Sequence, residues 1–179
     1  VLNENVHLLP VGVDMNKFSR DNYSSVEIRK EMQIPAGKLT IGMMGRMTPG
    51  KGHEEFLEAA KKINETHKEN VTFLVSGNAS YGEEEYESKI KNYARELNIS
   101  NIVFSGYSDK APKMLAAMDI LAFPSHDESF GRVLLEAMAM EIPVTDRPLA
   151  NPAIAAVNAA LSPRGVLTSP KGTSAPSQA

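Results

Sequence analysis

Short apolar runs alternate with segments of helical periodicity along most of this chain. Strand-like runs occupy residues 6–9, 39–44, 71–75, 102–104, 120–123 and 142–144. Several are apolar nearly throughout, which is typical of strands buried on both faces. Helical spacing predicts helices over residues 24–32, 54–66, 83–97, 110–118 and 130–140. The alternation predicts an α/β fold in which a parallel sheet lies between two layers of helices.

Composition narrows the class of protein. The 179 residues are enough for one domain with a core, and the formal net charge is -3. No basic block suggests nucleic acid, and the absence of Cys excludes disulfides and thiol nucleophiles. No apolar run approaches the roughly 20 residues that span a bilayer. Since the first residues do not resemble a signal peptide, we expect a cytoplasmic protein.

The composition changes after about residue 145. Residues 146–179 are rich in Pro, Ala and Ser, so we expect a divergent or disordered tail after a domain of residues 1–145. The chain does not begin with Met and runs almost directly into a strand-like segment. We therefore expect a fragment of a longer protein.

The first motif follows the strand-like run that ends at Met44. Residues 45–52 read Gly-Arg-Met-Thr-Pro-Gly-Lys-Gly, a loop with three glycines and two cations that leads into a predicted helix. Glycines let backbone approach a ligand, and Arg46 and Lys51 can neutralise phosphates. The spacing also matches the start of a P-loop, but Gly52 stands where a P-loop has Ser or Thr. A plain Pro-Gly turn with solvated charges is the other alternative.

The second motif is a pair of glutamates, Glu128 and Glu136, separated by seven residues around Gly131. A helix beginning near residue 130 would put Glu128 in the preceding loop and Glu136 about two turns into the helix. Such carboxylates can accept hydrogen bonds from sugar or ribose hydroxyls, although two ordinary surface glutamates are an alternative. Residues 126–128 (His-Asp-Glu) could suggest a metal, but consecutive loop residues rarely point at one ion, and no metal site is predicted.

Several segments occur in an order typical of one enzyme family: Pro10–Asp14, Gly45–Gly52, Val71–Gly77, Phe104–Tyr107 and Pro124–Ala139. Together they resemble the C-terminal domain of a retaining GT-B glycosyltransferase of the GT4-like group (glycosyl transferases group 1). The resemblance covers about residues 6–144. It implies a Rossmann-like domain, one half of a GT-B fold, that binds a nucleoside-diphosphate sugar.

The resemblance also implies roles for residues of both motifs. Arg46 and Lys51 would hold the diphosphate, Glu136 the ribose hydroxyls, and Glu128 the donor sugar. Arg46, Lys51 and Glu128 would act in catalysis. The implied binding residues are Gly45, Arg46, Lys51, Tyr107, Ser108, Glu128, Ser129, Phe130, Gly131 and Glu136. Tyr107 and Ser108 would lie near the base of a UDP- or GDP-linked donor, and no cofactor is expected.

The sequence departs from the family pattern in three places. The N-terminal acceptor-binding domain is missing, Val11 stands where the family often has Asn, and the usual Gly-rich continuation does not follow Val144. We therefore expect an incomplete C-terminal part that favours association of copies, and a chain that transfers no sugar alone. Peripheral membrane contact would need the absent domain. The alternatives are a non-catalytic nucleotide-binding or assembly module and a P-loop-like NTPase.

Overall fold

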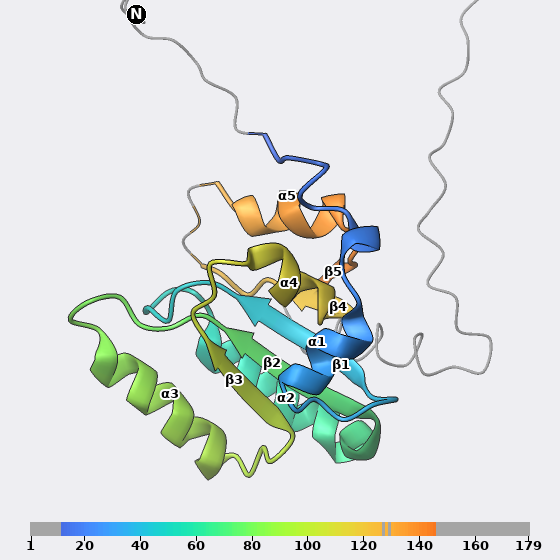
Figure 1. Cartoon of the computed structure of the whole chain (residues 1–179). Helices are drawn as coiled ribbons and strands as arrows, with labels where there is room; N and C mark the ends of the chain where they lie inside the picture. Colours follow the sequence, from blue (N-terminus) through green and yellow to red (C-terminus); the bar gives the residue numbers. More distant parts are fainter. Residues whose placement is uncertain (1–11, 127, 129, 146–179) are drawn as a thin grey trace, which may run out of the picture.

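Five parallel strands form the sheet in the computed structural model, which describes residues 12–126, 128 and 130–145 (Figure 1). Their order is β3-β2-β1-β4-β5. The strands are β1 (Leu39–Met44), β2 (Val71–Ser76), β3 (Ile102–Gly106), β4 (Ile120–Ala122) and β5 (Val144–Thr145). All four pairings are parallel. The predicted parallel sheet is confirmed, and the predicted run at residues 6–9 lies outside the described residues.

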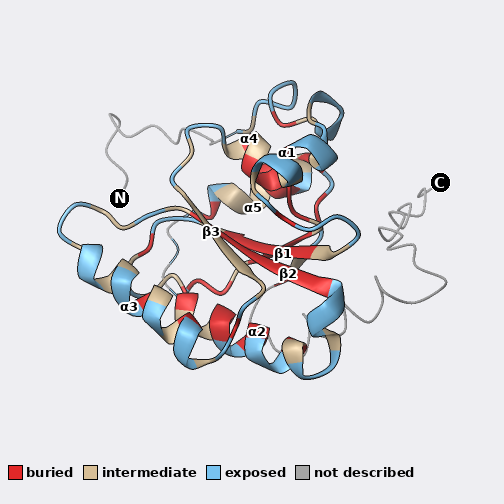
Figure 2. Cartoon of the chain, turned by 60° about the horizontal axis from the view of Figure 1, so that its bottom comes forward, coloured by how far each residue is buried: buried red, intermediate tan, exposed pale blue. Residues whose placement is uncertain are grey.

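Helices cover both faces of this sheet, as predicted. Figure 2 shows α1, α4 and α5 on one side and α2 and α3 on the other. Their bounds are α1 (Ser25–Glu31), α2 (His53–His67), α3 (Glu84–Glu96), α4 (Ala111–Ala116) and α5 (Arg132–Ala139), with short 3₁₀ turns at η1 (Arg20–Asn22) and η2 (Lys68–Asn70). Ser24 caps α1 by accepting a hydrogen bond from the backbone N–H of Glu27. None of the helices in the described residues is long and apolar enough to cross a membrane.

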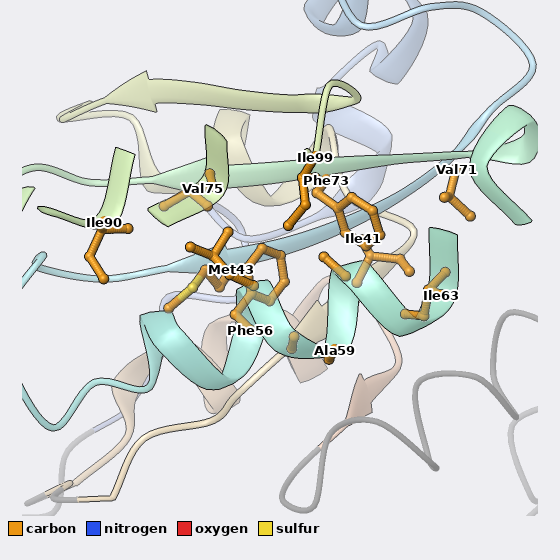
Figure 3. Close-up of a cluster of buried hydrophobic side chains, with 14 of the residues drawn as sticks. Ile41, Met43, Phe56, Ala59, Ile63, Val71, Phe73, Val75, Ile90 and Ile99 are labelled. Atoms are coloured by element: carbon orange, nitrogen blue, oxygen red, sulfur yellow. The ribbon is translucent and has the colours of Figure 1, made fainter. Parts of the chain in front are cut away.

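Two apolar clusters hold the three layers together. In the cluster of Figure 3, Phe56 of α2 meets Phe73 of β2 edge to face with ring centroids 5.9 Å apart, and Ile41 and Met43 of β1 pack beside them. The cluster on the other face joins α1, α4 and α5 to Leu74 of β2 and to β4. Every residue of β2 is buried, which explains why its apolar residues do not alternate with exposed polar ones.

Helix α5 differs from its prediction. It begins at Arg132 rather than near residue 130, because Gly131 adopts a left-handed conformation (φ 69°) that ends the preceding loop. Its run of apolar residues predicts a largely buried helix, and that prediction is wrong. Only Glu136 and Ala137 are buried within it, and Met138 is 67% exposed. One face of α5 packs in the apolar cluster, so residues on its other face stay exposed.

The loops after β1 and β2 approach each other closely at the carboxyl edge of the sheet. The backbone N–H of Gly45 donates to the carbonyl of Ser76 at 3.0 Å, and that of Met47 donates to Asn78 at 2.8 Å. Gly77 has a φ of 136°, and a Cβ there would lie 1.8 Å from the carbonyl oxygen of Gly45. Only glycine therefore fits at position 77 without separating the two loops.

We predict that Gly77→Ala destabilises the fold by at least about 3 kcal/mol, since it adds a backbone clash to an unfavourable φ. The matched control is Gly82→Ala, where φ is also positive (86°) but nothing lies within 4 Å of the added Cβ. The control should cost only about 1 kcal/mol. Urea denaturation measures both, and equal losses would contradict the close approach.

Candidate functional site

The candidate site lies beside β1, between the strands on its two sides, where the chain changes the direction in which it adds strands to the sheet. The chain runs from β1 outward through β2 to β3, and then returns to place β4 on the other side of β1. The loops that follow β1 (residues 45–52) and β4 (residues 123–131) flank a cleft of about 250 Å³. Ligands of open parallel sheets bind in this type of crevice.

A second cleft, of about 350 Å³, lies at the opposite edge of the sheet, near the amino ends of β2 and β3. Its lining includes Lys38, Lys68 and Asn101 and none of the predicted site residues. We therefore place the candidate site in the cleft between the loops after β1 and β4, and we call it the donor cleft after the sugar donor that the sequence resemblance implies.

The loop after β1 is held against the loop after β4. The backbone N–H of His126 donates to the carbonyl of Gly50 at 2.8 Å. Gly52, which precedes the first residue of α2, has a φ of 80°, and a Cβ there would lie 2.4 Å from the carbonyl oxygen of Pro124. A P-loop needs a Ser or Thr hydroxyl at this position, and no larger residue fits here without moving Pro124. The geometry therefore disfavours the P-loop alternative.

Lys51 and Glu128 form an ion pair across the donor cleft. Lys51 Nζ lies 2.7 Å from Glu128 Oε2, and the two side chains are 23% and 27% exposed. The hydrogen bond from Lys51 holds the pKa of Glu128 below its ordinary value, although burial opposes this. The backbone N–H groups of Gly131 and Phe130 act in the same direction as Lys51. Glu128 is therefore a carboxylate at neutral pH, next to a cation that could bind phosphate.

Glu136 has a partner that the sequence prediction missed. Its Oε1 lies 3.3 Å from Nη2 of Arg132, one turn earlier in α5. Glu136 is the fifth residue of α5, and thus about one turn into the helix rather than two. The spacing of four residues between the two charges was the signal that could have revealed the pair.

The structure brings some of the predicted residues together and not others. Those that line the donor cleft are Gly45, Arg46, Lys51, Glu128 and Gly131. Phe130 is 51% exposed beside it, and Ser129 lies outside the described residues. Tyr107 and Ser108 follow β3, which β2 separates from β1, and they do not line the cleft. Ser125 and Arg132 line it and were not predicted.

His126 pairs with Glu55 of α2, which links the loop after β4 to the first turn of that helix. Among the described residues, no three His, Asp or Glu side chains gather as metal ligands would. Asp127, the middle residue of the His-Asp-Glu run, lies outside the described residues.

His53 is buried at the start of α2, directly after the cationic loop. Its ring meets that of Tyr86 edge-on, with centroids 6.0 Å apart. Neither ring nitrogen has a hydrogen-bond partner among the described residues. Burial lowers the pKa of His53 to about 4, although the neighbouring Glu54 and Glu55 oppose this shift. The imidazole is therefore neutral at physiological pH and acts as part of the packing between α2 and α3.

Comparison with known proteins identifies the family. The family model "Glycosyl transferases group 1" matches residues 24–170. A D-inositol 3-phosphate glycosyltransferase of Corynebacterium jeikeium is 33% identical over 146 residues, which cover 78% of this chain and 34% of that protein. This chain therefore belongs to the glycosyl transferases group 1 family, as the resemblance predicted.

Solved structures agree with this assignment. The C-terminal domain of LpcC, a glycosyl transferase group 1 family protein from Francisella tularensis, matches with a TM-score of 0.66 and 30% identity, covering 75% of this chain and 70% of that one. Anabaena HepE, in complex with UDP and glucose, matches with a TM-score of 0.66 and 26% identity, over 75% of this chain and 36% of HepE. The fold is that of a Rossmann-like half of a GT-B glycosyltransferase.

The chain spans about a third of the length of the curated relatives it matches. The match covers 70% of the isolated C-terminal domain of LpcC but only 36% of the HepE chain. The chain is thus comparable with one domain of its longer relatives.

We predict that His53 makes stability depend on pH. The folded pKa of about 4 lies below the unfolded value of about 6.5, so the unfolded chain binds more protons between these values. The free energy of unfolding should therefore fall by roughly 3 kcal/mol as the pH drops from 6.5 to 4. Urea denaturation at several pH values between 5 and 6.5 measures how the free energy of unfolding depends on pH. The carboxylates whose pKa is lowered below 4.5 titrate below this range and contribute little to the slope.

The substitution His53→Leu should remove this slope, whatever its effect on stability at pH 7. His67→Leu is the matched change at the other end of α2 and should keep it. A slope that persists in His53→Leu would show that another group carries the proton linkage.

Proposed function

We propose that this chain binds the nucleoside-diphosphate sugar donor of a glycosyltransferase in the donor cleft. The observation that carries the proposal is the meeting of Arg46, Lys51 and Glu128 between the loops after β1 and β4. Cations suit a diphosphate, and a carboxylate suits sugar hydroxyls. HepE, whose structure contains UDP and glucose, supports this choice of ligand.

In the transfer reaction, the bond between the anomeric carbon and the diphosphate oxygen breaks, and its electron pair stays on the diphosphate. The acceptor hydroxyl forms the new bond to carbon and loses its proton. Arg46 and Lys51 would stabilise the negative charge that develops on the leaving diphosphate, which is an electrostatic role. We propose retention of the anomeric configuration, as in the family that the sequence resembles.

The chain's length relative to its relatives bears on activity. Because it spans about a third of their length, we propose that sugar transfer needs the parts of the longer protein that bind the acceptor. We therefore expect no transfer from a nucleotide sugar by this chain alone. The alternative, a non-catalytic nucleotide-binding module, would bind the same ligands. It would still transfer no sugar after the acceptor-binding part of the longer protein is added, and this result distinguishes the two proposals.

Calorimetric titration with UDP, GDP, ADP and CDP tests the proposed ligand class and the base. UDP is expected to bind best, given HepE, with GDP as the alternative. Tyr107 and Ser108 were predicted near the base, and Tyr107 is 72% exposed at the end of β3. No binding by any of the four nucleotides would refute the proposed function.

We predict that Arg46→Ala and Lys51→Ala each weaken binding of UDP. Loss of one charge-assisted hydrogen bond costs about 1.5–3 kcal/mol, which is roughly ten- to 150-fold in Kd. The matched control is Lys61→Ala, which removes an exposed lysine about two turns into α2. This variant should bind UDP with normal affinity. Normal affinity in both cleft variants would rule out these residues as diphosphate ligands.

We predict that Glu136→Gln weakens binding of UDP more than binding of its 2′,3′-dideoxy analogue, because Glu136 is proposed to accept hydrogen bonds from the ribose hydroxyls. The ion pair with Arg132 is exposed at its arginine end (68%), so its loss should lower stability by less than about 1 kcal/mol. Calorimetry and thermal unfolding measure the two effects. Equal weakening of both ligands would exclude the ribose role, and unfolding of the variant without ligand would make Glu136 structural.

A further inference from the structure

Three of the four charged side chains that line the donor cleft are in ion pairs, one of them with Glu136, which does not line the cleft. Lys51 contacts Glu128 at 2.7 Å, and Arg132 contacts Glu136 at 3.3 Å. Arg46 also lines the cleft and makes no ion pair among the described residues. A diphosphate that reaches Lys51 must therefore bind beside the carboxylate of Glu128 or displace it.

The substrate and the product of the proposed reaction differ in charge at this position. In a nucleotide sugar, the second phosphate is esterified and carries one negative charge. In the free nucleoside diphosphate, that phosphate is terminal, and its second ionisation has a pKa of about 6, as in other phosphate monoesters. At pH 7.5 the product therefore carries nearly one more negative charge than the substrate.

We propose that Glu128 is a specificity-determining residue that disfavours the free nucleoside diphosphate relative to the sugar-linked diphosphate through charge repulsion. This inference rests on the proposed function, since it assumes that the diphosphate binds at Lys51. It goes beyond the sugar contact that the family resemblance implies for Glu128, because the repulsion acts on the phosphate and needs no sugar.

The geometry gives this repulsion a short range. An oxygen that accepts a hydrogen bond from Lys51 Nζ lies within about 6 Å of the Glu128 carboxylate, since each is about 2.7–2.9 Å from the ammonium. The Lys51 and Glu128 side chains are 23% and 27% exposed, so water screens this repulsion in part but does not remove it at this separation. One extra charge at this distance should change affinity roughly tenfold.

The consequence is easier release of the product. While the sugar is attached, the second phosphate carries a single charge and can share Lys51 with Glu128. After transfer, the added charge on the terminal phosphate faces the fixed carboxylate. The backbone N–H groups of Gly131 and Phe130 also favour the charged form of that carboxylate.

The test compares three ligands at pH 7.5: UDP, the β-methyl ester of UDP, and UDP-glucose. The methyl ester lacks both the sugar and the extra charge, so it separates charge repulsion from sugar contacts. Glu128→Gln removes the negative charge beside Lys51 and should tighten binding of UDP and of its methyl ester. UDP should gain roughly tenfold more than the ester, which corresponds to about 1.4 kcal/mol.

Two control variants complete the experiment. Glu128→Asp keeps the charge and should keep the wild-type ratio between UDP and its methyl ester. Glu96→Gln removes one exposed carboxylate at the end of α3, which leads to the amino edge of the sheet, and should also leave the ratio unchanged. Thermal unfolding confirms that each variant is folded.

The outcomes separate the inference from the function on which it rests. If the wild-type chain binds UDP and its ester but Glu128→Gln leaves their ratio unchanged, the charge inference is wrong and the proposed function stands. If Glu128→Gln weakens only UDP-glucose, Glu128 is a sugar ligand alone and the inference is also overturned. If the wild-type chain binds none of the three ligands, nor the corresponding guanosine compounds, the inference and the proposed function fail together.

Discussion

The donor cleft depends on backbone contacts that hold the loop after β1 on both sides. Towards β2, the N–H groups of Gly45 and Met47 donate to residues 76 and 78, and towards β4 the carbonyl of Gly50 accepts from His126. These contacts need backbone to approach backbone, so glycine occupies positions 52 and 77, where a Cβ would collide. The side chains of Arg46 and Lys51 therefore extend from a loop whose path is fixed, which favours a preorganised charge site.

Charge balance is the second property of the cleft. Three cations and two carboxylates lie at or beside it, and four of these five groups form two ion pairs. Pairing reduces the cost of keeping partly buried charges away from water. It also means that an incoming anion that reaches Lys51 or Arg132 must share or replace a carboxylate that is already bound there. This arrangement favours ligands that can share the cations with the carboxylates already bound to them. Ligands with more negative charge are not favoured, because the carboxylates repel them.

Much of the fold was predictable because its signals are local. Strand β1 was predicted with its observed bounds, since an apolar run of that length between helical segments has few other solutions. Strand order is not local, and it placed β3 two positions from β1, which took Tyr107 and Ser108 away from the cleft lining. The start of α5 depended on the left-handed Gly131, which no periodicity reveals. Both features arise from tertiary geometry that the spacing of residues does not contain.

The two cations predicted to bind phosphate differ in their surroundings. This difference suggests that they act at different steps of ligand binding. Arg46 is exposed and makes no ion pair among the described residues, whereas Lys51 is about three-quarters buried and bonded to Glu128. An arriving diphosphate can meet Arg46 without displacing a carboxylate, so Arg46 is suited to initial capture. Lys51 can bind only after its contact with Glu128 is shared or exchanged, and its surroundings weaken screening, so its charge acts more strongly on the bound ligand. We therefore expect Arg46 to govern chiefly the rate of association and Lys51 the strength of the bound state.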